Sequence, residues 1–177
     1  MRCFIAIDLP EDVKEKLVNL QNHLKDLEDV KIKFVEKGNL HLTLKFLGEI
    51  SDVEINRIKE KLKQLDFNKL RCEIGSVGVF PSPNYIRVVW ISLEPLSTLR
   101  ELAEKVNSLL DKKEDKFDSH ITLGRVKFVK DRISFIKKLD GLKISKEEFV
   151  VNEIKLKKST LTSNGPVYED IFVVKLG

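Results

Sequence analysis

The sequence predicts an α+β protein of two lobes, in which two antiparallel sheets are related by an approximate two-fold axis and carry helices on their outer faces. Strand-like segments outnumber helical ones, and the connections between neighbouring strands suit antiparallel pairs. A four-residue motif, His-x-Thr-Leu, occurs twice in strand-like runs, at His41 and at His120. This pseudo-repeat predicts two similar halves within a single domain over residues 1–177, with a cleft between them.

The first half of the chain alternates strands and helices. Residues 2–9 are apolar on both faces, as is typical of a central strand, and Pro10 then opens a helix with leucines at helical spacing. The short strand over residues 31–36 and the strand over residues 40–47 are expected to form a hairpin or pack as neighbours, because a Lys-Gly-Asn turn separates them. Ser51 begins a capping box for the next helix.

The second half continues with strands and helices. Strands over residues 70–80 and 85–93 are expected to pair across a Pro-Ser-Pro-Asn loop. The remaining elements are expected in this order: a helix from Pro95, the second motif strand over residues 119–128, a short helix after Asp131, and strands over residues 148–157 and 167–176.

Composition limits the classes of function. The net charge of +4 permits binding to a polyanion but does not require it. The two cysteines lie in apolar runs and are expected as buried free thiols, since neither a disulfide framework nor a zinc cluster is indicated. No apolar run approaches the roughly 18 residues of a membrane span, and Asp8 comes too early for a signal peptide. We therefore expect a cytoplasmic protein with no membrane partner.

The two motifs contain two of the three histidines in the chain. Strict alternation places His41, Thr43 and Lys45 on one face of the first motif strand and apolar residues on the other. Two imidazoles at one site can act together as general acid and general base, because their unperturbed pKa of about 6.5 lies near neutrality. Hydrolysis of a phosphodiester needs both proton transfers, and threonine hydroxyls can hydrogen-bond the phosphate oxygens.

Three alternatives compete with this interpretation. Each histidine could be a structural residue, although two identical contexts argue against that. The pair could bind a metal, but a zinc site needs at least three protein ligands and no third is evident on either strand. Ser119 could form a nucleophilic pair with His120, but adjacent strand residues point to opposite faces. Glycine-rich nucleotide loops are absent from the sequence, so no nucleotide cofactor is expected. Because no third ligand is evident, no metal is expected either.

The flanks of both motifs resemble those of a known family. Residues 2–7, 39–48, 119–125 and 165–168 are similar to the RNA 2′,3′-cyclic phosphodiesterases, historically called 2′-5′ RNA ligases, of the two-histidine phosphoesterase superfamily. Ser119 stands where this family often has proline. The resemblance implies a bilobal fold whose four motif side chains meet in a central cleft. It also implies metal-independent opening of a terminal 2′,3′-cyclic phosphate to a 2′-phosphate.

The same resemblance implies a role for each motif side chain. His41 is expected to be the proton donor to the departing 3′-oxygen, and His120 the proton acceptor from water. Thr43 and Thr122 are expected to hold the phosphate oxygens.

Three further residues are candidate substrate contacts. Lys45 shares the predicted face of the first motif, and Tyr168 or a phenylalanine is expected to stack on a terminal base. Strict alternation puts Arg125 on the face opposite His120, so its contact requires either a bulge or the end of the strand near Gly124.

The expected partner is RNA that ends in a 2′,3′-cyclic phosphate, tRNA fragments included, and the chain is expected to be a monomer. Two other activities remain open, namely ATP-independent 2′-5′ ligation of RNA and hydrolysis of a small cyclic nucleotide. A third possibility, from a different class, is a non-catalytic module that holds RNA ends.

Overall fold

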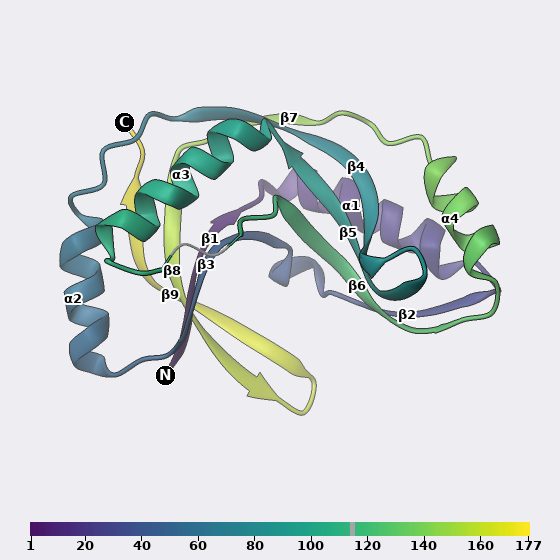
Figure 1. Ribbon diagram of the computed structural model, residues 1–177, viewed down its shortest axis with the longest axis horizontal. Helices are drawn as coiled ribbons and strands as arrows, with labels where there is room; N and C mark the ends of the chain where they lie inside the picture. The colour runs from purple at the N-terminus through teal and green to yellow at the C-terminus, as the bar shows by residue number, and fades with distance from the viewer. Residues whose placement is uncertain (114–115) are drawn as a thin grey trace.

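The computed structural model describes residues 1–113 and 116–177. Within these residues the elements follow one another in this order (Figure 1): β1 (Arg2–Asp8), α1 (Glu11–Lys25), β2 (Val30–Phe34), the 3₁₀ turn η1 (Lys37–Asn39), β3 (His41–Glu49), α2 (Asp52–Leu62), β4 (Leu70–Ser82), β5 (Tyr85–Glu94), α3 (Leu96–Leu109), β6 (His120–Val129), α4 (Arg132–Asp140), β7 (Glu148–Val151), β8 (Glu153–Thr162) and β9 (Gly165–Lys175).

The strands form two antiparallel sheets, as the sequence predicts. One sheet has four strands in the order β3-β1-β8-β9, and the other has five in the order β2-β6-β5-β4-β7. Helices α2 and α3 lie beside the four-stranded sheet, and α1 and α4 lie beside the five-stranded sheet (Figure 1). The α+β class is therefore confirmed. Among the described residues, no helix is both long and apolar enough to span a membrane.

Local sequence signals explain where the helices begin. Helix α1 follows Pro10 and buries a leucine-rich stripe against the core. Ser51 and Glu54 form the predicted capping box of α2, each side chain bonded to the backbone N–H of the other. Asp131 caps α4 by accepting a hydrogen bond from the N–H of Ser134.

The predicted pairing of the strands on either side of residues 37–39 is wrong. Strand β2 pairs with β6, whereas β3 pairs with β1 in the other sheet. The Lys-Gly-Asn segment forms the 3₁₀ turn η1, which carries the chain from one sheet to the other instead of closing a hairpin. The apolar side chains of β2 and β3 nevertheless pack against one common hydrophobic core.

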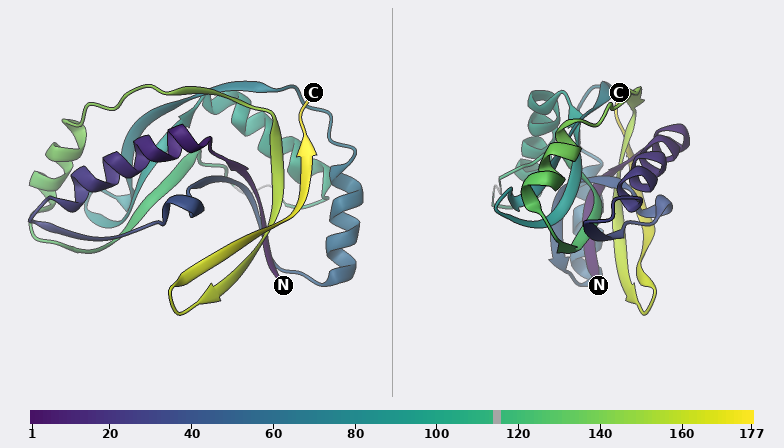
Figure 2. Two further views of the ribbon diagram at one scale, coloured as in Figure 1. Left: turned by 180° about the vertical axis from the view of Figure 1, so that it is seen from behind. Right: turned by 90° about the vertical axis from the view of Figure 1, so that its right-hand side faces the viewer.

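The strand predicted over residues 148–157 is divided in the structure. It breaks at Asn152 into β7, which joins the five-stranded sheet, and β8, which joins the four-stranded sheet. The carbonyl of Asn152 accepts a hydrogen bond from the N–H of Leu176, which holds this crossing point. The β8–β9 hairpin then extends beyond the rest of its sheet as an arm, visible from the front and from behind (Figures 1 and 2).

A buried amide ties the segment before the first motif to the second motif. Gln21 in α1 is 5% exposed, and its Nε2 donates to the carbonyls of Val35 and Leu123, each at 2.9 Å. Burying an amide without such partners would be costly. This side chain therefore fixes the position of the loop that leads into His41 relative to the strand that carries His120.

The close approach of β2 to β6 requires a glycine at position 124. A Cβ there would lie 2.5 Å from Ile32 Cγ2 and 3.0 Å from the carbonyl oxygen of Lys33. We expect Gly124→Ala to lower the free energy of unfolding by about 1–3 kcal/mol, because the backbone of β2 must shift to admit the methyl group. Gly38→Ala is the matched control, since nothing lies within 4 Å of the place that its new methyl group would take. Equal denaturation midpoints for the two variants would contradict this packing account.

Both cysteines are free and buried, as the sequence predicts. Burial raises the pKa of the Cys72 thiol to about 12 and also raises the pKa of Cys3. Both thiols are therefore protonated at neutral pH and serve as small apolar core residues.

Candidate active site

Each motif histidine is oriented by the carbonyl group two residues before it. His41 Nδ1 lies 2.6 Å from the oxygen of Asn39, and His120 Nδ1 lies 3.1 Å from the oxygen of Asp118. Because a carbonyl oxygen only accepts hydrogen bonds, Nδ1 carries the proton in both rings and Nε2 is left for chemistry. The pseudo-repeat in the sequence thus corresponds to a repeated local geometry.

Both motif strands contain a bulge at the same position. The β1–β3 ladder omits Leu44, and the β5–β6 ladder omits Leu123. A bulge re-aims the residues that follow it. Phe46 and Arg125, each five residues after its histidine, therefore return to the face that carries the histidine.

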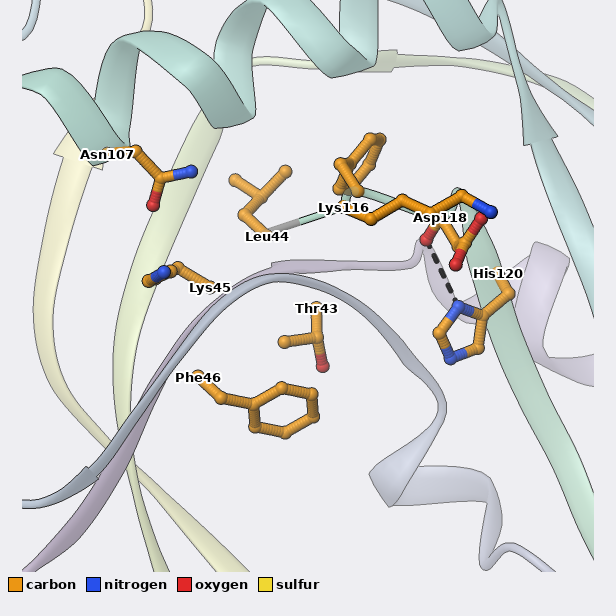
Figure 3. A pocket seen from close by; sticks show the side chains of 9 residues that line it. Thr43, Leu44, Lys45, Phe46, Asn107, Lys116, Asp118 and His120 are labelled. Atoms are coloured by element: carbon orange, nitrogen blue, oxygen red, sulfur yellow. Dashed lines mark hydrogen bonds between the residues drawn. The ribbon is translucent and has the colours of Figure 1, made fainter. Parts of the chain in front are cut away.

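The bulge overturns the predicted orientation of Lys45. This residue lies opposite Ile5, a core residue, and is 7% exposed. Its Nζ donates to the carbonyl of Lys113 at 2.9 Å, although Lys45 still contributes to the lining of the pocket near Thr43 (Figure 3). Phe46, predicted to face the core, is instead 68% exposed. Whether Lys45 contacts substrate remains a prediction.

The bulge required for Arg125 is present, so this side chain shares the face of His120 and Thr122. The charge of Arg125 affects the pKa of Tyr168, a residue of the other sheet. Burial raises the pKa of the Tyr168 hydroxyl, and the charges of Arg125 and Arg2 act against that increase. The charge of Arg125, a residue of the five-stranded sheet, therefore acts on Tyr168 of the four-stranded sheet.

Aromatic rings contact both imidazoles. The Tyr168 ring meets His41 edge-on at 5.3 Å between centroids, and the Phe4 ring lies 5.1 Å from His41. Phe80 meets His120 edge-on at 5.0 Å. Sequence reasoning named Tyr168 but neither Phe4 nor Phe80, because both belong to ordinary apolar strand patterns. These contacts restrict the rotation of the two imidazole rings.

The motifs of the two sheets meet at one site. Thr43 from β3 and His120 from β6 line the same pocket, together with Phe46, Asn107 and Lys116 (Figure 3). The Thr43 hydroxyl also lies 2.9 Å from His41 Nε2. Thr43 and His120, which are 77 positions apart in the sequence, therefore line one pocket. In the described part of the chain, no three side chains of His, Cys, Asp or Glu converge where they could hold a metal ion.

An ion-pair cluster flanks His41 on the same sheet. It comprises two carboxylates and two ammonium groups, which contact one another at 2.7–2.9 Å: Asp8, Lys155, Lys157 and Asp170. Asp8 lies directly opposite His41 in the β1–β3 ladder, so the two side chains share one face. The sequence did not reveal this cluster, because its members come from three strands and match no spacing.

The environment of His41 favours its neutral form. Burial is the largest cause of its lowered pKa, and the charges of Lys157 and His120 act in the same direction. The hydrogen bond to Asn39 and the carboxylate of Asp8 act against them. The charge of His120 is the smallest of these influences on His41.

Comparison with known proteins identifies relatives along nearly the whole chain. The family described as LigT like Phosphoesterase matches residues 7–90 and 92–168. An RNA 2′,3′-cyclic phosphodiesterase of Methanocaldococcus jannaschii is 42% identical over 97% of this chain and 98% of its own length. A protein of the same name from Archaeoglobus fulgidus is 37% identical over 98% of this chain and 99% of its own length.

Solved structures agree with the fold. A crystal structure of a Thermus thermophilus protein has a TM-score of 0.76 and 27% identity, covering 99% of this chain and 98% of the other. Escherichia coli LigT in its apo form has a TM-score of 0.78 over 99% of this chain and 96% of its own. At 24% identity, that second likeness concerns the fold alone.

Proposed function

The chain belongs to the LigT-like phosphoesterase family, and on that premise we propose that it hydrolyses the 2′,3′-cyclic phosphate at the end of an RNA strand to a 2′-phosphate. The observation that carries the proposal is that Thr43 and His120 line one pocket, while the Thr43 hydroxyl lies 2.9 Å from His41 Nε2. Two imidazoles that are held through Nδ1, with Nε2 of His41 bonded to the Thr43 hydroxyl, suit a phosphodiester, whose hydrolysis needs two proton transfers.

In the proposed reaction His120 Nε2 accepts a proton from water, and the water oxygen attacks phosphorus. The bond between phosphorus and the 3′-oxygen breaks. His41, which enters the reaction as the imidazolium with a proton on both ring nitrogens, donates its Nε2 proton to that oxygen. The phosphate remains on the 2′-oxygen. The histidines end in exchanged protonation states, and proton exchange with solvent restores them.

Thr43 and Thr122 donate hydrogen bonds to the non-bridging oxygens as negative charge develops on them. The Thr43 hydroxyl lies beside His41 Nε2, so a bound phosphate oxygen would replace that contact. Every step uses side chains of this chain, and the proposal therefore includes independence from metal ions.

The test is hydrolysis of an oligonucleotide that ends in a 2′,3′-cyclic phosphate, measured in EDTA. We expect turnover to a 2′-phosphate product. A 3′-phosphate product would overturn the assignment of the leaving oxygen, and loss of activity in EDTA would overturn metal independence. Tight binding without turnover would support the non-catalytic module, and a 2′-5′ junction formed on addition of a 5′-hydroxyl RNA would reveal ligation.

The pH dependence of Asp8→Asn tests which histidine donates the proton. Removing the carboxylate opposite His41 lowers the pKa of His41 further, because Asp8 acts to raise it. If His41 is the donor, its protonated fraction falls at every pH above its pKa, so kcat/KM on the basic limb is expected to drop about three- to tenfold, since one pKa unit is tenfold. If His41 were the acceptor, the plateau of kcat/KM would stay and only the acid limb would extend to lower pH.

Asp170→Asn is the matched control for this experiment. It removes a carboxylate from the same ion-pair cluster but not the one opposite His41 in the ladder. We expect Asp170→Asn to lower kcat/KM in the same direction as Asp8→Asn, but by a smaller factor. Equal effects of the two substitutions would indicate that the cluster acts through its total charge and not through Asp8.

A further inference from the structure

The face of the five-stranded sheet that carries His120 continues away from the site along β6 and β2. Val30, Ile32 and Phe34 of β2 pack against the core, so the alternating residues Lys31 and Lys33 point away from it. The ladder places Lys33 opposite Arg125 and Lys31 opposite Phe128. The same face therefore presents, in order from the site, His120 and Thr122, then Arg125 with Lys33, then Phe128 with Lys31.

The cations on this face are available to a ligand. Lys31, Lys33 and Arg125 are exposed. None of the three forms an ion pair with a carboxylate of the described residues. Neither β2 nor β6 contains an acidic residue. The surface is thus positive along its length, whereas the lysines nearest His41 on the other sheet are neutralised by Asp8 and Asp170.

An exposed aromatic ring lies beyond these cations. Phe128 is 58% exposed, although its strand neighbour Val126 is buried. A bulge at Lys127 turns Phe128 to the same face as Lys31. Aromatic rings interleaved with cations are the combination that binds single-stranded nucleic acid, because rings stack on bases while cations contact phosphates.

From these observations we propose that Lys31, Lys33 and Phe128 bind the nucleotides that precede the cyclic phosphate, so that the RNA strand runs from the catalytic pocket along β6 and β2. We call these three residues the β2–β6 track. The inference rests on the proposed function, because it takes RNA as the substrate. From His120 to Phe128 the strand rise gives roughly 25 Å, enough length for several nucleotides.

The track predicts that its variants lower kcat/KM for an oligonucleotide substrate but not for a mononucleotide. The double variant Lys31→Ala with Lys33→Ala is expected to lower kcat/KM about tenfold at low salt for a short oligonucleotide that ends in a cyclic phosphate. The same variant should leave kcat/KM for adenosine 2′,3′-cyclic phosphate unchanged, since a mononucleotide does not reach the track. Phe128→Ala should act in the same selective way, by about tenfold, through loss of stacking.

Salt dependence and a matched control distinguish direct phosphate contacts of Lys31 and Lys33 from an effect of the protein's net charge. Single-stranded nucleic acid gives a slope of about −0.7 in log affinity against log salt for each neutralised phosphate. The double variant should therefore have a slope shallower by about 1 to 1.5. Lys69→Ala with Lys137→Ala removes two exposed lysines outside β2 and β6 and should change neither slope nor selectivity. Equal losses in the two double variants would overturn the track.

The track and the proposed activity can fail separately. If the wild-type protein hydrolyses both substrates but the track variants lose nothing on the oligonucleotide, the track is wrong and the activity stands. If the wild-type protein hydrolyses neither, fluorescence anisotropy with a labelled oligonucleotide still tests the track. Weaker binding by the track variants, but not by the control, would support it, and equal binding would overturn it.

Discussion

Replacing either motif histidine with alanine is expected to lower kcat on a cyclic-phosphate oligonucleotide by about 10³-fold or more. Each imidazole performs one proton transfer, and such transfers contribute about 10²–10⁴-fold. His41→Ala removes the donor to the leaving oxygen, and His120→Ala removes the acceptor from water. The double variant should be little worse than either single variant, because residues that act as a unit are strongly non-additive.

The third histidine of the chain supplies the control. His23 lies exposed on α1, so His23→Ala should keep full activity and an unchanged melting temperature. Melting temperatures of the motif variants show whether a loss of activity reflects folding. A folded His120→Ala protein with near-normal turnover would mean that this ring takes no part in the reaction.

The second large effect is expected from the motif threonines. Thr43→Val and Thr122→Val should each lower kcat about 10²-fold, the range found when one donor to a developing oxyanion is removed. Valine keeps the shape of threonine and removes only the hydroxyl, so folding is expected to survive. Because the hydroxyl acts as charge develops, the loss should appear mainly in kcat and less in KM.

Serine variants test whether the hydroxyl is the active part. Thr43→Ser and Thr122→Ser keep the donor and should retain activity within about tenfold of the wild type. If serine and valine variants were equally impaired, the methyl group and not the hydroxyl would be the important feature. The threonines would then be packing residues for the histidine rings.

The sequence predicted most elements and the pairing of β4 with β5, but it misplaced the partners of β2 and β3. Every predicted helix is present, since caps such as Ser51 and Asp131 act locally. Strand pairing depends on distant segments, and the turn at residues 37–39 was taken for a hairpin although β2 pairs with β6. The break at Asn152, where the chain changes sheets, has no strong local signal such as proline or glycine.

The site shows the same division between local and distant information. The sequence predicts His41, Thr43, His120 and Thr122 as site residues because the motif repeats within it. The orientation of Lys45 was wrong because a bulge shifts the alternation by one residue, and an alternation pattern does not contain that shift. The need for a bulge before Arg125 was anticipated only because Gly124 interrupts its strand.

The central claim is that two distant imidazoles act on one phosphate. Its most direct test is a crystal structure of the wild-type protein with adenosine 2′-phosphate, the product that the proposed reaction leaves on a mononucleotide. The account predicts that His41 Nε2 and His120 Nε2 both lie within hydrogen-bonding distance of that phosphate or of the freed 3′-hydroxyl. A phosphate bound by only one of the two rings, with the other turned away from it, would contradict the account.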